Sequence, residues 1–491
     1  MRTVTRRQAI SLVASIVILL AIVSGGHRFT AALRAQQAPD RSTAPKPGPP
    51  PSLKLPAIQK RTLSNGLAVW VVELHKVPVV NVNLVLRAGS GADPAGKFGL
   101  ANLTAEMLDE GAGTRDALQI ADAVDYLGAS LSTSSSSDAA FVDLHVPVAR
   151  LGDALPIMSD VALHPTFPEA ELKRVREELL TSILEAADDP ASLVQFAFPR
   201  LVYGPTHRYG TVSMGSAASL KGLTVGDMRQ FHATRYVPSN ATLIVTGDVN
   251  PATVTAQLES AFGGWKGATA PATQIPAAPQ LSSRKVYLVD KPGAPQSQIR
   301  IGWIGVPRST PDYFALRVLN TVLGGAFTSR LNQNLREQHG YAYGASSSFD
   351  MRGAAGPFYA AAGVQTDKTA EALSEFFKEL DGIRKPVPAE ELDKAKNYVA
   401  LLLPRNFETT QSLAGSLAQM FIFNLPADYF ETFTSRVRAV TQAEVQGAAE
   451  RYIQPDKFAV VVVGDLKTIE PGIRALNLGP VSTVTIDEIM K

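Results

Sequence analysis

The sequence predicts an α+β protein in which one fold is made twice, as two homologous α/β-sandwich domains after an N-terminal export segment and a Pro-rich tether. Three observations lead to this prediction. Short sequence features recur about 217 residues apart, a Gly-, Ala- and Pro-rich stretch at 263–283 lies between the copies, and each copy mixes strand-like with helix-like segments. Helices packed on an antiparallel sheet bury both kinds of segment.

The repeat is seen most directly around a Thr, a Pro and a Gly-Asp pair. A second pair of similar segments lies upstream in each copy, PEAEL at 168–172 and PAEEL at 388–392. Two sets of similar segments, in the same order and separated by nearly the same number of residues, indicate a duplicated domain of about 200 residues. The pairs separated by 217 residues are Thr224 and Thr441, Pro238 and Pro455, and Gly247-Asp248 and Gly464-Asp465.

The N-terminus has the features of an export signal. Arg2, Arg6 and Arg7 precede an apolar run at 9–23, which is shorter than a typical membrane span. We therefore expect residues 1–35 to be a signal peptide or an uncleaved N-terminal anchor. The protein would then be exported, either periplasmic or held at the outer face of the inner membrane.

The rest of the chain divides by composition. Residues 36–54 are rich in Pro and polar residues and are expected to be a tether without a packed core. A first domain is predicted at 55–265, a linker at 266–283 and a second domain at 284–485.

The first domain alternates strand and helix patterns. β-branched runs at 67–74 and 79–86 predict strands, and another strand is expected at 141–148. Apolar residues at helical spacing predict a helix at 99–110, with Gly111 as its stop, and a long charged helix at 169–186.

Composition excludes several kinds of function. The 47 Lys and Arg against 45 Asp and Glu give a formal charge of +2, so the net charge does not indicate binding to nucleic acid. The chain has no cysteine, which excludes disulfides, thiol catalysis and thiolate metal sites. Its seven histidines are scattered, and no two are spaced i, i+4 as zinc ligands on one helix would be.

A resemblance to a known family adds to this picture. The run RAGS at 87–90 through GLA at 99–101, the PEAEL segment, DDP at 188–190 and LNQNLREQHGYAYG at 331–344 resemble the insulinase-like (pitrilysin) metallopeptidase family. The resemblance covers nearly all of 53–479. It implies repeated α+β domains that form a chamber around extended peptides.

The family's zinc motif, H-x-x-E-H, follows a Gly-Leu-Ala like that at 99–101. On a helix its first and fifth residues bind zinc, and the fourth is the general base. The resemblance places Asn102, Ala105 and Glu106 at these positions, and Ser182 at the third ligand. The motif is thus degenerate, and we expect no metal and no catalytic residue in this chain.

The second half keeps more of the family pattern. Arg336 and Tyr343 match the family's pair that reaches across the chamber to hydrogen-bond the substrate backbone. A guanidinium and a phenol are donors to a peptide carbonyl. The resemblance therefore implies that Arg336 and Tyr343 bind substrate. The Ser-rich segment 128–138 lies where the family has an edge strand that pairs with peptide, and it could equally be a solvated polar hairpin.

Some members of the family work as heterodimers like the mitochondrial processing peptidase. The leading expectation is a non-catalytic subunit that contributes substrate-binding surface to a heterodimeric zinc peptidase for peptide degradation or processing. The zinc would be bound by the partner subunit, and this chain alone would be inactive. The alternatives are a non-proteolytic peptide-binding or structural scaffold, and a stand-alone metallopeptidase with a non-standard site near Glu106, Glu178 or Glu185.

Overall fold

The structure, a computed structural model, describes residues 56–491. The expected signal or anchor at 1–35 and the tether at 36–54 lie outside the described residues. No helix within 56–491 is both long enough and apolar enough to cross a membrane.

The first sheet has six strands in the order β1-β2-β8-β3-β7-β6. β2 and β8 run parallel, and the other neighbouring pairs are antiparallel. Alternation along β3 and β7 points one set of residues into the core of the first half. The strands are β1 (Gln59–Thr62), β2 (Ala68–Glu73), β3 (Val79–Leu86), β6 (Ser130–Ser135), β7 (Ala140–Pro147) and β8 (Ala241–Gly247), with the separate short pair β4 (Gly111–Ala112) and β5 (Arg115–Asp116).

The second sheet repeats this order. Read from β9, its strands run β9-β13-β10-β12-β11, which match β2-β8-β3-β7-β6 in chain order and position. The pair β9 and β13 is parallel like β2 and β8, and the edge beside β9 is occupied by β14, a later strand that pairs parallel where β1 is antiparallel to β2. The strands are β9 (Lys285–Asp290), β10 (Gln296–Ile304), β11 (Ala342–Phe349), β12 (Pro357–Gln365), β13 (Ala459–Gly464) and β14 (Val481–Val484). The α+β fold made twice is confirmed.

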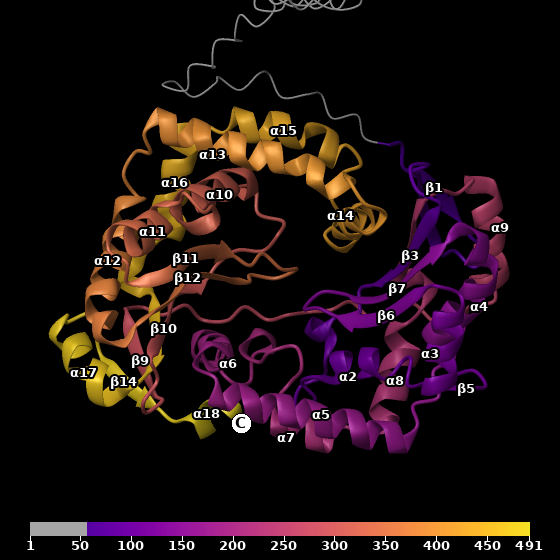
Figure 1. Ribbon diagram of the computed structural model, residues 1–491, viewed down its shortest axis with the longest axis horizontal. Helices are drawn as coiled ribbons and strands as arrows, with labels where there is room; N and C mark the ends of the chain where they lie inside the picture. The colour runs from indigo at the N-terminus through magenta and orange to yellow at the C-terminus, as the bar shows by residue number, and fades with distance from the viewer. Residues whose placement is uncertain (1–55) are drawn as a thin grey trace, which may run out of the picture. The chain divides into compact units, whose positions relative to one another are not determined.

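Helices surround both sheets (Figure 1). In the first half they are α2 (Leu100–Glu106), α3 (Ala117–Tyr126), α4 (Leu151–Leu163), α5 (Glu169–Asp188), α6 (Pro190–Tyr203), α7 (Ala217–Gly222), α8 (Val225–Arg235) and α9 (Pro251–Phe262). In the second half they are α10 (Tyr313–Asn320), α11 (Arg330–Asn332), α12 (Thr369–Gly382), α13 (Ala389–Leu402), α14 (Thr410–Ile422), α15 (Tyr429–Ala439), α16 (Gln442–Tyr452), α17 (Leu466–Ala475) and α18 (Ile486–Met490), with π-helical turns at Thr321–Gly325 and Gln333–Gln338.

The repeated residues have the same local role in both halves. Thr224 caps α8 and Thr441 caps α16, each in a reciprocal capping box with the acidic residue three positions later. The two PEAEL-like segments begin α5 and α13, with Pro168 and Pro388 as the residues before the first turn. The repeat in sequence is therefore a repeat of helix starts and of buried strands.

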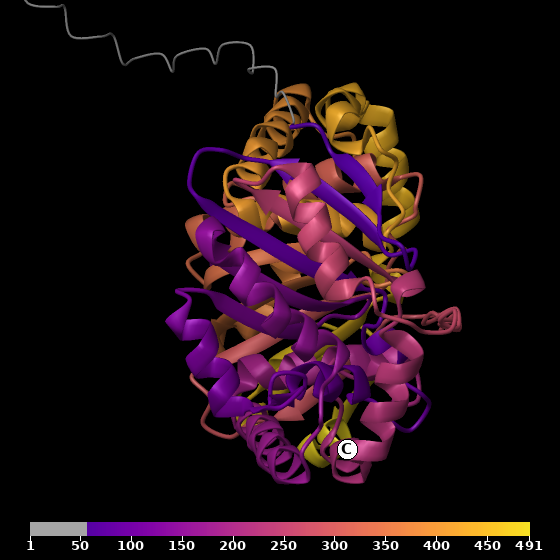
Figure 2. The same cartoon turned by 90° about the vertical axis from the view of Figure 1, so that its right-hand side faces the viewer.

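Each half contributes one helix to the sheet of the other. α6 packs on β10 and β13 of the second sheet, and α14 packs on β3 and β8 of the first. The first half lies in front of the second in Figure 2. Arg87 fixes the end of α14, because its Nη2 donates to the carbonyl oxygen of Phe421 at 2.6 Å and to Asn424 Oδ1 at 2.5 Å. In return, the hydroxyl of Tyr203 at the end of α6 donates to the carbonyl oxygen of Ala355 at 2.9 Å.

The expected strands of the first half are present within one residue or so of their predicted bounds. The helix expected at 99–110 is shorter and ends at Glu106. Met107 and Leu108 are fully buried, and the chain must turn there to begin the strand β4. The helix expected at 169–186 continues to Asp188. The Ser-rich segment forms β6, an edge strand of the first sheet.

Candidate functional site

The residues at the degenerate motif positions lie in the last turns of α2. Asn102 and Glu106 are half-buried neighbours, and Asn102 Nδ2 donates to Glu106 Oε1 at 2.8 Å. Ala105 is fully buried and cannot accept a proton. Burial is the main cause that raises the pKa of Glu106, and the charges of Asp109, Glu178 and Glu110 add to it.

Ser182 is exposed on α5, a helix that contacts α2. The residue of α5 whose charge acts on Glu106 is Glu178, one turn earlier. The structure thus joins Asn102 and Glu106 by a hydrogen bond, whereas in the described chain no hydrogen bond joins Ser182 to either of them.

An arginine pairs with the carboxylates that lie near Glu106. Arg174 on α5 contacts Glu110 at 2.5 Å, Glu171 at 2.7 Å and Glu178 at 2.9 Å. These contacts raise the pKa of Arg174 still further above its ordinary value. Arg174 was not among the residues predicted from the sequence, although its i, i+4 spacing to Glu178 is a visible signal.

This set of residues does not fit a zinc ion. Zinc in proteins takes imidazole, thiolate and carboxylate ligands, whereas α2 has no imidazole or thiolate and the carboxylates of Glu110 and Glu178 are in contact with Arg174. Within 56–491, no three His, Asp or Glu side chains are arranged to hold a metal ion.

Asp93 holds the start of α2. Its Oδ2 accepts from the backbone N–H of Gly99 at 2.8 Å, and its Oδ1 from that of Ala101 at 2.7 Å. Burial nevertheless raises the pKa of Asp93 to about 7, with the charge of Arg208 opposing the shift.

This pKa predicts a pH-dependent stability. The folded state binds the proton of Asp93 more tightly than the unfolded chain, whose pKa is near 3.8, so the contribution of Asp93 is largest below pH 4 and is lost as the pH rises to 7. Asp93→Asn removes this dependence. In urea unfolding, we expect the free energy of unfolding of wild type relative to Asp93→Asn to fall by about 3 kcal/mol between pH 5 and 8. A constant difference would mean that Asp93 is ionised throughout.

Arg336 and Tyr343 lie side by side. The Arg336 guanidinium carbon is 5.3 Å from the centre of the Tyr343 ring and 4.5 Å from the centre of the Phe327 ring. Tyr343 is 88% exposed and Phe327 is 62% exposed, which is unusual for such large side chains. A half-buried cation in contact with two exposed aromatic rings is held in place yet open to a ligand.

Local backbone irregularities aim these side chains. Arg336 lies in a π-helical turn, a feature frequent at functional sites. Tyr343 lies in a bulge of β11, because Tyr343 and Gly344 together oppose the single residue Gly363 of β12. The buried Asn332 connects the parts, since it donates to the carbonyl oxygen of Phe327 at 2.7 Å and accepts from the N–H of Ala345 at 3.1 Å.

Phe327 and Asn332 were not found from the sequence. The signal for Phe327 is weak, a single aromatic residue shortly after the pair Gly324-Gly325. Asn332 lies within the segment 331–344, but its role depends on contacts that spacing does not reveal.

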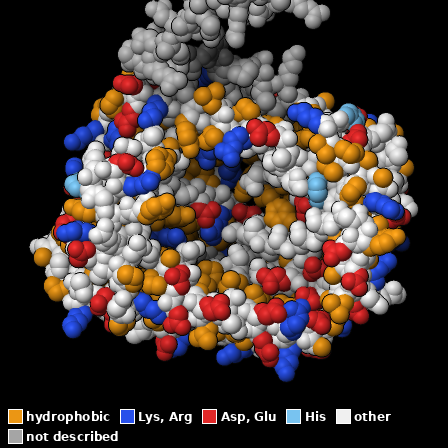
Figure 3. All heavy atoms as spheres, viewed as in Figure 1, with side chains coloured by type: hydrophobic (Ala, Val, Ile, Leu, Met, Phe, Trp, Pro, Cys, Tyr) orange, Lys and Arg blue, Asp and Glu red, His pale blue; other side chains and the backbone are white. Residues whose placement is uncertain are grey.

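The face of the protein seen in Figure 3 is hollowed in the middle, and hydrophobic, basic and acidic side chains lie in the hollow. Figure 1, in the same view, shows α14 and the strands β6 and β11 around it. β6 is an edge strand, so one side of its backbone has no strand partner within the described chain.

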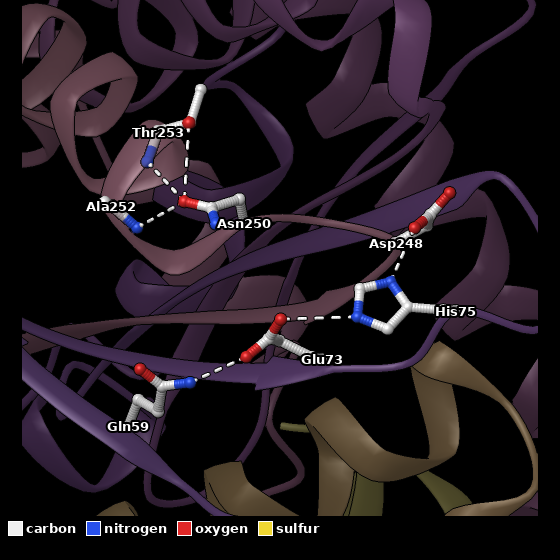
Figure 4. Close-up of polar contacts among 7 residues, drawn as sticks. All are labelled: Gln59, Glu73, His75, Asp248, Asn250, Ala252 and Thr253. Atoms are coloured by element: carbon white, nitrogen blue, oxygen red, sulfur yellow. Dashed lines mark hydrogen bonds and ion pairs between the residues drawn. The ribbon is translucent and has the colours of Figure 1, made fainter.

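A separate polar cluster lies at the C-terminal end of β2 (Figure 4). The ring of His75 is 2.6 Å from Asp248 Oδ1 and 3.3 Å from Glu73 Oε2, and Gln59 donates to Glu73 at 2.7 Å. The hydrogen bond to Asp248 is the main cause that raises the pKa of His75. Both ring nitrogens are already bonded, so this cluster connects loops and does not resemble a metal centre.

Comparison with known proteins identifies the family. Residues 69–207 match the family described as "Insulinase (Peptidase family M16)", and residues 222–399 match "Peptidase M16 inactive domain". The chain belongs to the M16 peptidase family. The expected insulinase-like membership is therefore confirmed.

Bacterial M16 relatives match over most of the chain. An uncharacterized zinc protease of Bacillus subtilis, YmxG, is 24% identical over 83% of this chain and 98% of its own length. Another, Rv2782c of Mycobacterium tuberculosis, is 26% identical over 83% of this chain and 93% of its own.

Solved structures show the same fold. A crystal structure described as a peptidase M16 inactive domain from Pseudomonas fluorescens has a TM-score of 0.77 and 27% identity, and covers 83% of this chain and 98% of that one. The crystal structure of a protease from Helicobacter pylori has the same TM-score at 23% identity, and covers 83% of this chain and 100% of that one.

Proposed function

We propose that this M16 chain is the non-catalytic subunit of a heterodimeric zinc peptidase that degrades or processes peptides. The observation that carries the proposal is the exposed pair of Arg336 and Tyr343, in a chain whose α2 offers no imidazole or free base. Groups that hold a peptide carbonyl are present without groups that bind zinc, which suits a subunit that binds substrate for a partner.

In this proposal, Arg336 and Tyr343 donate hydrogen bonds to the substrate backbone. A guanidinium and a phenol stabilise a carbonyl oxygen as negative charge develops on it, and neither is consumed. Phe327 and Asn332 position them. The unpaired edge of β6 adds main-chain hydrogen bonds to an extended peptide.

The partner in this proposal is a second M16 chain that carries H-x-x-E-H and supplies the zinc. Both subunits would be exported, because Arg2, Arg6 and Arg7 precede the apolar run at 9–23. They would act in the periplasm or at the outer face of the inner membrane.

The test combines this chain with an H-x-x-E-H-bearing M16 chain from the same cell. We expect the two to elute as one complex in gel filtration and to cleave an unstructured, internally quenched peptide. Neither chain alone should do so at a comparable rate, and a chelator should abolish the cleavage.

Other outcomes would support the alternatives. A complex whose activity is independent of this chain would indicate a structural scaffold. Chelator-sensitive cleavage by this chain alone would indicate a stand-alone metallopeptidase, against which the contacts of Arg174 with Glu110 and Glu178 argue.

A further inference from the structure

We infer that the second sheet carries a subsite for a carboxylate of a bound peptide, which is either an acidic side chain or the C-terminus of that peptide. The subsite is centred on the guanidinium of Arg300 in β10, on the face of the sheet that carries Tyr343. This inference rests on the proposed function, because it adds a contact to a peptide that Arg336 and Tyr343 hold.

Strand register places Arg300 on one face of the second sheet. Arg300 lies opposite Ala361 of β12, and on the other side of β12 Ala361 lies opposite Ser346 of β11. Residues directly opposite each other point to the same face of a sheet. The neighbouring pair of Ile301 and Ala360 lies in the core of the second half, so Arg300 points away from that core.

This face is open over β11 and β12. α6 packs on it over β10 and β13, whereas Ser346 on β11 is exposed and Ala361 on β12 is half-buried. In Figure 1, β11 and β12 lie beside the region that is hollowed in Figure 3. A peptide in this hollow can therefore lie against the part of the face that α6 leaves open.

The charge of Arg300 has no anionic partner in the described chain. Its Nε is buried and lacks a hydrogen-bond partner there. The guanidinium carbon is 4.4 Å from the centre of the Tyr359 ring and 5.8 Å from that of the Phe198 ring. Burial lowers the pKa of Arg300, and Tyr359 alone opposes this shift, so no carboxylate of residues 56–491 acts on the guanidinium.

Two other half-buried arginines of the second half do have a carboxylate. Arg330 is 2.6 Å from Glu391, and Arg352 is 2.6 Å from Asp350. A guanidinium that has lost part of its hydration without such a partner favours an anionic ligand. Its planar set of N–H donors matches the two oxygens of a carboxylate, and the aromatic rings beside Arg300 restrict its position.

Tyr343 lies on the same face, one row away from Arg300. It opposes Gly363, which stands between the core residues Ala362 and Val364 and therefore faces outward like Ala361. Two residues along β12 span about 7 Å and two strand spacings about 10 Å, so the backbones at Tyr343 and Arg300 are about 12 Å apart.

This separation suits a peptide held at Tyr343. An extended peptide advances about 3.3 Å per residue, and the long side chain of Arg300 covers part of the distance. The residues between them, Ala361 and Gly363, are small and leave room for the peptide. A carboxylate a few residues from the carbonyl that Arg336 and Tyr343 bind can therefore reach the guanidinium of Arg300.

The test measures binding of three labelled peptides to the full chain by fluorescence anisotropy. All consist of Thr, Val and Ala around one central residue. The neutral peptide has a central glutamine and an amidated C-terminus, the second has a central glutamate instead, and the third has the glutamine and a free C-terminal carboxylate. We expect at least one charged peptide to bind at least tenfold more tightly than the neutral one. The preferred peptide identifies the source of the carboxylate.

Two substitutions should bring these affinities within twofold of each other. Arg300→Gln removes the positive charge. Ala361→Asp supplies a carboxylate directly opposite Arg300 and leaves its contacts with the rings of Tyr359 and Phe198 in place. Because Ala361→Asp keeps Arg300, it also serves if Arg300→Gln does not fold, and a purely structural role of Arg300 does not predict its effect on binding.

Matched variants isolate the charge. Arg384→Gln removes an exposed arginine that follows α12 and should leave the tenfold preference unchanged. Ala361→Asn has the size of the aspartate without its charge and should retain most of the preference.

The subsite and the proposed function fail in different ways. Equal binding of all three peptides to wild type would overturn the subsite and leave peptide binding standing. A preference that survives both Arg300→Gln and Ala361→Asp would do the same. If none of the peptides binds, both the subsite and the peptide-binding surface of the proposed function are wrong.

Discussion

Arg336→Ala is expected to lower kcat/KM of the assembled peptidase by about 100-fold while the complex still forms. The guanidinium contacts the rings of Phe327 and Tyr343 and the carboxylate of Glu337, so its position is restricted before substrate binds. A donor held in this way acts most strongly on the charge that develops in the transition state. The measurement is cleavage of the quenched peptide by complexes of equal, gel-filtration-verified composition.

Two variants make this result interpretable. Arg438→Ala removes an exposed arginine from α15 and should leave kcat/KM unchanged. Tyr343→Phe keeps the ring against Arg336 but loses the hydroxyl, and we expect a smaller loss of about tenfold. Full activity of Arg336→Ala would rule out its role in substrate binding.

Gly302→Ala is expected to destabilise the protein by about 3 kcal/mol or more. Gly302 lies in β10, between β12 and β13 in the middle of the second sheet. A Cβ added there would be 1.9 Å from the carbonyl oxygen of Phe358 and 2.8 Å from the Cα of Tyr359. Both are backbone atoms of the neighbouring strand, so relief requires the strands to separate. Urea unfolding of the purified variant measures the loss.

Gly415→Ala is the matched control for the same chemical change. Gly415 lies on the exposed side of α14, and a Cβ there meets nothing within 4 Å. Alanine should therefore raise the free energy of unfolding by about 0.5–1 kcal/mol through its higher helix propensity. Equal effects of the two substitutions would contradict the close approach at Gly302.

The fold was predictable because the repeated residues have local roles. Thr224 and Thr441 cap helices through side chains three residues away, and a cap of this kind is visible in a short stretch of sequence. The alternation in β3 likewise predicts a strand without knowledge of its neighbours, but the expected half-burial is wrong, because α14 covers the second face and nearly the whole strand is buried. The end of α2 was not predictable, because the apolar Met107 and Leu108 continue the helical pattern after the helix has stopped.

The candidate site was predictable only in part. Arg336 and Tyr343 came from a segment whose residues are contiguous, but the bulge that exposes Tyr343 depends on its pairing with β12. The hydrogen bond from Asn81 to Asp143 joins β3 to β7, about sixty residues apart along the chain, and it exists only in the register of those strands. In sequence, Asn81 and Asn83 appear simply as the polar positions of an alternating strand.

The exchange of α6 and α14 has a consequence for how the protein unfolds. Each half covers its sheet with a helix of the other, so unfolding of one half exposes part of the sheet in the other. We therefore expect the two halves to unfold together in a single cooperative transition, although each has a sheet and a hydrophobic core of its own.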